Sequence, residues 1–290
     1  MNVKIIPPKD IKELSIYLEK MNAQSAAHIG FCGEEREEIH DSLMNDFSDL
    51  SINDSFLVAY NDAEIIGAIG LDIDLEDQYA DVWGPFVTNN DIEIAQKLWN
   101  DILLKAPEDV KSFSFFINEN NLYVKEFLQK NNAKFSGTDF VFSITKDTIS
   151  SIGVTESIKF EKAYQKSFEE LHNTAFPKTY FNANEIINRI NEENTLLLMK
   201  NDDTNIKGYV YIETQPKHKE ANIEYVSVDP DLRGNGIGKK LIEDALNQIF
   251  SYPTIEEVDI CVSSTNEKAI NLYKSVGFKD KYILESYEIQ

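Results

Sequence analysis

The chain has 290 residues, of which 42% are hydrophobic, and it carries a formal net charge of −22 at pH 7. That charge argues against wrapping of nucleic acid or docking on an anionic membrane, because both require a surplus of Lys and Arg. The sequence contains no run of about 18 apolar residues and no secretory signal, so we expect a cytoplasmic globular protein with no nucleic-acid or membrane partner.

The cysteines and histidines indicate neither a disulfide nor a metal-binding site. Cys32 and Cys261 stand far apart, and the four histidines form no metal-ligand spacing. A disulfide framework or a zinc site would require more closely spaced residues of these types. We therefore predict two free thiols and no metal.

The first half of the chain alternates short strand-like and helix-like segments. The Asn61-Asp62 turn joins the first two strands, and the segment 148–151 is the natural linker to the second half. The pattern predicts strands over 55–60, 65–71, 79–87, 112–117 and 135–143, with helices over 92–104 and 122–130.

The second half repeats this order at an offset of roughly 140 residues, which indicates duplication of a domain. We therefore predict two domains, 1–150 and 151–290. In the second half, helices are predicted over 162–176, 184–190, 236–250 and 266–276, and strands over 195–200, 208–213, 221–228, 258–263 and 278–289.

The most informative segment is 226–239, VSVDPDLRGNGIGK. A strand leads through Pro230 into three glycines, and a helix begins at once. The first N–H groups of a helix have no partners within the helix, so they favour an anion in front of it. Glycine lets the backbone approach a phosphate closely, and Arg233 supplies a cation. The segment predicts a site for a phosphate-bearing ligand.

Two other phosphate loops do not fit this segment. A Walker loop needs four residues before its Gly-Lys-Ser/Thr, and a dinucleotide fold needs a third glycine that is missing after Gly238. Taken alone, however, Arg-x-x-Gly-x-Gly is also compatible with an ordinary turn and helix start.

Two segments of the second half resemble sequence motifs of a known family. Val226 to Leu241, V-x-V-D-P-x-x-R-G-x-G-I-G-K-x-L, resembles the acetyl-CoA-binding motif A of the GNAT N-acetyltransferase superfamily. Asn266 to Phe278, N-x-x-A-x-x-L-Y-x-x-x-G-F, resembles its motif B at the expected distance. The resemblance covers residues 155–290. It implies an α/β (α+β) protein with two GNAT-like domains, each a mixed, mostly antiparallel sheet flanked by helices.

The resemblance also implies roles for individual residues. The backbone of Val226, Ser227 and Val228 would bind the pantetheine arm of coenzyme A, and Asn266 would contact it near the thioester. Tyr273 would be the general acid near the sulfur, although buried packing is the alternative role for this tyrosine. The pyrophosphate would be held by Arg233, Gly234, Asn235, Gly236, Ile237, Gly238 and Lys239.

A base for the acceptor amine is a separate requirement, because a free alkyl amine has a pKa of about 10.4 and is protonated at pH 7. Strand alternation predicts Glu224 on the face of Val226 and Val228. Glu224 resembles the strand glutamate that acts as base in a number of GNAT enzymes, and Glu213 on the neighbouring strand is the second candidate.

The first half departs from the GNAT pattern where the chemistry would occur. Residues 83–91, WGPFVTNND, lack Arg-x-x-Gly-x-Gly, and the carboxylates of Asp91 and Glu93 would repel a phosphate. Its last helix offers Phe127 or Leu128 where a tyrosine would stand. We expect a degenerate GNAT-like domain that binds no cofactor.

The expected function is N-acetyltransfer from acetyl-CoA, used as a co-substrate, to a primary amine on a small molecule or a protein. Two alternatives stay open: a non-catalytic acyl-CoA-binding sensor or scaffold, and an acyltransferase whose larger acceptor spans both domains. The sequence does not specify the acceptor, the acyl chain length or the oligomeric state, for which a homodimer is one alternative.

Overall fold

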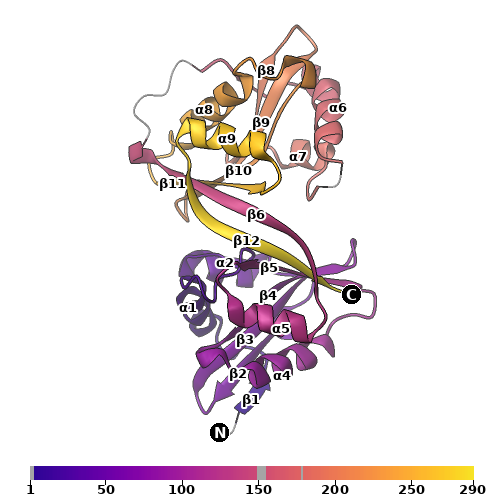
Figure 1. The fold of residues 1–290 in the computed structure, drawn as a ribbon, viewed down its shortest axis with the longest axis vertical. Helices are drawn as coiled ribbons and strands as arrows, with labels where there is room; N and C mark the ends of the chain where they lie inside the picture. The colour runs from indigo at the N-terminus through magenta and orange to yellow at the C-terminus, as the bar shows by residue number, and fades with distance from the viewer. Residues whose placement is uncertain (1–2, 149–154, 178) are drawn as a thin grey trace. The chain divides into compact units, whose positions relative to one another are not determined.

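A computed structural model describes residues 3–148, 155–177 and 179–290. The chain forms two compact units, Met1–Asp139 with Ile283–Gln290, and Phe140–Tyr282 (Figure 1). The predicted domain boundary between residues 150 and 151 lies outside the described residues. None of the described helices is long and apolar enough to cross a membrane.

The first unit is a mixed sheet with helices packed on it. Its strand order is β1-β2-β3-β4-β5-β12, in which β4 and β5 run parallel and the other neighbours run antiparallel. Its elements are β1 (Val3–Ile6), α1 (Ile11–Asn22), α2 (Arg36–Asn45), α3 (Ile52–Ser55), β2 (Phe56–Asn61), β3 (Glu64–Asp74), β4 (Tyr79–Val87), the 3₁₀ turn η1 (Thr88–Asn90), α4 (Ile92–Leu103), β5 (Ser112–Asn118), α5 (Leu122–Lys130), and the first part of β6 (Lys134–Thr145), which is followed by η2 (Lys146–Thr148).

The second unit repeats the architecture with the strand order β6-β11-β10-β9-β8-β7, in which β10 and β11 run parallel. Its elements are β7 (Ile158–Lys159), η3 (Lys162–Tyr164), α6 (Gln165–Ala175), α7 (Ala183–Arg189), β8 (Asn194–Lys200), β9 (Ile206–Gln215), β10 (Glu220–Val228), η4 (Pro230–Leu232), α8 (Ile237–Ile249), β11 (Glu257–Ser263), α9 (Glu267–Val276) and β12 (Lys279–Ile289).

The last strand of each half of the sequence contributes to the sheet of the other half. The end of β12 pairs antiparallel with β5, and Tyr287 and Ile289 pack against the core of the first unit. Conversely, Phe142 and Ile144 of β6 are buried in the core of the second unit. Sequence analysis did not predict this exchange.

Two apolar layers cover the sheet of the second unit. One packs beneath α8 and α9, and the other beneath α6 and α7 (Figure 1). Strand alternation explains the division, because Val210 and Ile212 enter the α8–α9 layer while Tyr209 and Tyr211 enter the α6–α7 layer. Helix α8 buries one amphipathic face, as its sequence predicts: Leu241, Ile242, Ala245, Leu246 and Ile249.

Candidate active site

A bulge in β10 lies at Glu224. The strand pairs with β9 on both sides of this residue, but the register shifts between Ile223 and Tyr225. Ile223 and Val226 both pack in the α8–α9 layer, although residues three apart on a regular strand face opposite sides. One residue is therefore inserted at Glu224, and a bulge of this kind redirects side chains and increases the local twist.

The bulge changes the side of the sheet that Glu224 faces. Tyr225 packs in the α6–α7 layer, and the charged groups that act on Glu224 are Glu213 and Arg189, the last residue of α7. The prediction that Glu224 shares a face with Val226 and Val228 is therefore wrong, because regular alternation does not continue through the bulge. The carboxylate lies on the side of α7, opposite the helix α8.

Strands β10 and β11 separate after a short contact. One register pair, Asn222 with Asp259, joins them in parallel. Just after the end of β10, the N–H of Asp229 donates to the carbonyl of Lys207 at the start of β9, at 2.9 Å. Because backbone groups alternate in direction along a strand, those of Val226 and Val228 point to the opposite edge, where β11 has diverged.

The start of helix α8 has the geometry of an anion site. Its N-cap is Gly236, with a φ of 78°, and no side chain caps the first N–H groups. Gly234 also has a positive φ, of 83°. No atom lies within 4 Å of the position that a Cβ would take at either glycine, so a ligand can approach the backbone there.

The remaining residues of this loop hold its shape and stay accessible. The Nε of Arg233 donates to the carbonyl of Val228 at 3.0 Å, and the Nδ2 of Asn235 donates to the carbonyl of Leu232 at 3.0 Å. Residues 233–236 are all exposed. The guanidinium is thus tethered to the end of β10 beside the uncapped helix start.

Glu224 has the electrostatics of a base for neutral pH. The residue reaches solvent, whereas its carboxyl group is closely surrounded by protein. This loss of hydration, together with the charge of Glu213, raises the pKa of Glu224 to about 7, against a smaller opposite effect of Arg189. A carboxyl group with this pKa can both accept and release a proton near pH 7.

Glu213, the second candidate, is engaged in a polar network. Its Oε1 accepts hydrogen bonds from Arg189 Nε at 3.2 Å, from Arg189 Nη2 at 3.1 Å and from the Tyr211 hydroxyl at 2.7 Å. The guanidinium of Arg189 also lies 4.1 Å from the centroid of the Phe181 ring. One oxygen of the Glu213 carboxylate is therefore already occupied by contacts with Arg189 and Tyr211.

Tyr273 and Asn266 belong to helix α9 and its start. Tyr273 packs in the α8–α9 layer against the rings of Phe142 and Phe278. Burial raises its pKa, so the phenol keeps its proton at neutral pH. The Oδ1 of Asn266 accepts from the N–H of Ala269 at 3.2 Å, which makes this residue the N-cap of α9.

The corresponding strand opening in the first unit is filled by its own chain. Strands β4 and β5 pair only over Tyr79–Asp81 and Ser112–Ser114. Beyond that contact the N–H of Gly30 donates to the carbonyl of Phe116 at 2.7 Å, and Ile29 forms an antiparallel bridge with Ile117. Backbone groups along β5 point alternately to its two edges. Those of Phe116 and Asn118 bond to Gly30 and His28, whereas the N–H of Glu119 donates to the carbonyl of Ile283 on the side of β12.

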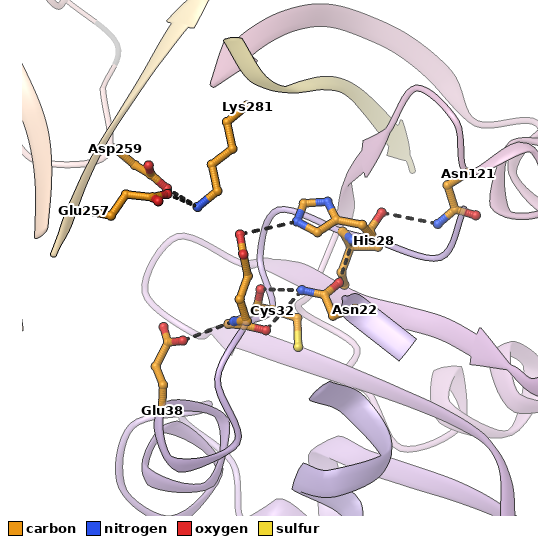
Figure 2. A network of polar contacts seen from close by, with 11 residues as sticks. Asn22, His28, Cys32, Glu38, Asn121, Glu257, Asp259 and Lys281 are labelled. Atoms are coloured by element: carbon orange, nitrogen blue, oxygen red, sulfur yellow. Dashed lines mark hydrogen bonds and ion pairs between the residues drawn. The ribbon is translucent and has the colours of Figure 1, made fainter. Parts of the chain in front are cut away.

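The buried side chain of Asn22 holds residues 28–33 in place (Figure 2). Asn22 accepts from the N–H of Ile29 at 2.8 Å and donates to the carbonyls of Cys32 at 2.9 Å and Gly33 at 3.1 Å. Asn121 donates to the carbonyl of His28 at 3.3 Å. Residues 28–33, called the filling segment below, are thus bound to the helices α1 and α5 of their own unit.

The structure brings the sequence-predicted residues together in two groups. Val226, Val228 and Tyr273 belong to the α8–α9 layer, next to the loop from Arg233 to Lys239, and Glu224 lies on the α7 side of the bulge. Sequence reasoning missed Arg189 and Tyr211. Their connection to Glu213 depends on contacts between distant segments, and no local pattern indicates it. Among the described residues, no cluster of His, Cys, Asp or Glu could hold a metal ion.

Comparison with known proteins agrees with this geometry. Residues 158–278 match the model of the acetyltransferase (GNAT) family. An uncharacterized N-acetyltransferase of Methanocaldococcus jannaschii is 34% identical over 77 residues, which cover 27% of this chain and 34% of the relative. The matched segments span between 29% and 55% of the length of such curated relatives.

Two solved structures share the fold over nearly the whole chain. A GCN5-related N-acetyltransferase from Sphaerobacter thermophilus aligns with a TM-score of 0.73 and 14% identity over 99% of this chain and 95% of that one. A tandem GNAT protein from the clavulanic acid biosynthesis pathway aligns with a TM-score of 0.68 and 14% identity over 99% of this chain and 98% of that one. Residues 158–278 therefore belong to the GNAT family, and the whole chain shares the fold of a tandem GNAT structure.

Proposed function

We propose that the second unit transfers an acetyl group from acetyl-CoA to a primary amine by direct attack. The observation that carries this proposal is the uncapped start of α8 at Gly236, beside the point where β10 and β11 separate. The loop from Arg233 to Lys239 would bind the pyrophosphate, and the backbone edge of Val226 and Val228 that faces away from β9 would bind the pantetheine arm. The acceptor is a small molecule or a protein that presents the amine.

Glu224 would prepare the nucleophile. Deprotonating an alkyl ammonium at pH 7 costs about 4–5 kcal/mol, because its pKa is about 10.4. The carboxylate of Glu224, with a pKa of about 7, can take this proton at the site. Its position at the bulge places it on the α7 side of the strand, while the coenzyme loop lies on the α8 side. The amine would therefore approach the thioester from the α7 side.

The bond changes are those of aminolysis of a thioester. The amine nitrogen attacks the carbonyl carbon, the carbonyl π electrons move to oxygen, and the C–S bond breaks when the tetrahedral intermediate collapses. The attacking nitrogen would then release its surplus proton to solvent, and Tyr273 would give its proton to the leaving thiolate and regain one from solvent. The raised pKa of the phenol keeps it protonated at neutral pH before this transfer. The products are an amide and the free thiol of coenzyme A.

The substitution Glu224→Gln tests the catalytic part of the proposal. We expect kcat to fall about 100-fold or more, because general-base catalysis contributes about that much, while the Kd for coenzyme A stays the same. Release of free thiol on a panel of amines gives kcat, and calorimetry gives Kd. Equal loss of turnover and coenzyme binding would remove Glu224 from the mechanism. Coenzyme binding without thiol release on any amine would favour an acyl-CoA sensor.

The pH dependence gives a second test. Glu224 acts as a base only when it is ionised, so kcat/KM should rise with pH up to about pH 7 and then level off on that limb. The limb should disappear in Glu224→Gln. A limb near the pKa of a free glutamate, at about 4.3, would contradict the role proposed for the surroundings of this residue.

A further inference from the structure

A polar network around Glu213 lies beside the proposed base, on the α7 side of the sheet. Glu213 stands opposite Asn222 in the register of β9 and β10, two residues before Glu224. Its side chain is 20% exposed and accepts three hydrogen bonds at one oxygen atom from Arg189 and Tyr211. The ion pair of Glu213 and Arg189 therefore places a negative and a positive charge near the carboxyl group of Glu224.

Arg189 is itself fixed from two directions. Its guanidinium binds Glu213 and lies over the ring of Phe181, whose N–H donates to the hydroxyl of Tyr225 at 3.2 Å. Tyr225 follows Glu224 directly in the bulge. The loop between α6 and α7, the end of α7 and the two strands are therefore connected around the proposed base.

We propose, on the basis of the proposed function, that Glu213 and Arg189 form a positioning pair that sets the protonation equilibrium of Glu224. Glu213 opposes ionisation of Glu224 by its like charge, and Arg189 favours ionisation by its opposite charge. Tyr211 fixes the orientation of the Glu213 carboxylate. The pair thereby keeps Glu224 able to exchange a proton with an amine near neutral pH.

Other charged groups near the strand do not compete with this pair. On β11, Asp259 stands opposite Asn222, and its carboxylate is bound by Lys281 at 2.8 Å. On α6, His172 contacts the Tyr209 hydroxyl at 2.6 Å and the carbonyl of Phe181 at 2.9 Å, and burial lowers its pKa, so it stays neutral. Glu213 and Arg189 are the charged groups that act on Glu224.

Two substitutions of opposite sign test the proposal. Glu213→Gln removes the negative charge and should shift the acidic limb of the kcat/KM profile about one pH unit lower. Arg189→Met removes the positive charge and should shift it about one pH unit higher. Arg189→Lys keeps the charge and should leave the limb within a few tenths of a pH unit. Glu169→Gln, the same change on α6, is the matched control and should not move it.

A titration that needs no turnover separates this proposal from the proposed function. Glutamate labelled with 13C at the carboxyl carbon is followed by NMR against pH, and the Glu224 signal is the one missing in Glu224→Gln. Opposite shifts of its midpoint in Glu213→Gln and Arg189→Met support the pair. Shifts of the same sign, or no shift in folded variants, overturn it. Loss of thiol release on every amine would count against the proposed function alone.

Discussion

The two units use the same helix position in opposite ways. The N-cap of α8 is a glycine, which has no side chain to bind the first N–H groups of the helix. The N-cap of α4 is Asp91, whose carboxylate accepts hydrogen bonds from the backbone N–H of Glu93 at 3.0 Å and of Ile94 at 3.3 Å. An aspartate at this position satisfies the N–H groups and opposes the positive end of the helix dipole. The first N–H groups of α4 are thus bound by a side chain, whereas those of α8 are not.

The space between β4 and β5 in the first unit also differs from the space between β10 and β11 in the second unit. In the first unit, the filling segment binds the edge of β5 that β4 leaves free, and Ile29 is 1% exposed. Within the part of the chain that the structure describes, no segment makes the corresponding bridge to β11 in the second unit. In the first unit the chain's own backbone occupies the space between the diverging strands; in the second unit this space is where we propose that the pantetheine arm binds.

The largest effect should come from giving α8 the cap that α4 has. Gly236→Asp places a carboxylate at the helix start; no atom lies within 4 Å of the added Cβ, although the φ of 78° is strained for any L side chain. We expect coenzyme A to bind on the order of 100-fold more weakly, because the cap competes for the N–H groups and repels the phosphates. Calorimetry measures the loss.

Gly236→Asn is the matched control for that substitution. Asn has nearly the same size and also tolerates a positive φ, but it carries no charge. It should weaken binding less than about tenfold. Equal losses in the two variants would show that shape, and not charge, governs this helix start.

A smaller but measurable effect should follow from releasing the filling segment. Asn22 is fully buried, and Asn22→Ala leaves one N–H and two carbonyl groups of that segment without their partner. The expected loss of stability is about 3 kcal/mol, roughly 1 kcal/mol for each lost bond. A lower urea midpoint would report it, and Asn45→Ala on the exposed side of α2 should change little. Unchanged stability would mean that the segment is held by other contacts.

The smallest effect should come from removing the cap of α4. Asp91→Ala should destabilise the first turn of this helix by about 1 kcal/mol, and Asp91→Ser should restore most of it. Faster hydrogen exchange at the Glu93 and Ile94 amides measures the change. Coenzyme A should gain no second site, because the filling segment still blocks the strand opening. A new binding site in Asp91→Ala would show that the cap alone keeps the first unit from binding.

Much of the fold could be predicted from the sequence where structure is local. Helix α8 was expected over 236–250 and occupies Ile237–Ile249, because glycine before it and a periodic apolar face within it define both its ends and its orientation. The loop 233–239 was also predicted, because its glycines and Arg233 are close together in the sequence. Strand β1 and helices α1 and α2 were not predicted.

The bulge at Glu224 was missed although its signal is in the sequence. Apolar residues alternate at Ala221, Ile223 and Tyr225, and then Val226 follows without a polar residue between. Two adjacent apolar residues in an alternating strand indicate a shift of phase. The strand exchange, the filling segment and the Arg189 network depend on contacts between distant residues. Such contacts follow from packing of the whole chain and leave no local pattern.

The stoichiometry of coenzyme A binding tests the central comparison most directly. Calorimetric titration of the full chain with coenzyme A should show one site per chain, provided by the uncapped start of α8. Two sites of similar affinity, or no binding at millimolar concentration, would contradict the assignment of an open helix start to one unit and a filled one to the other.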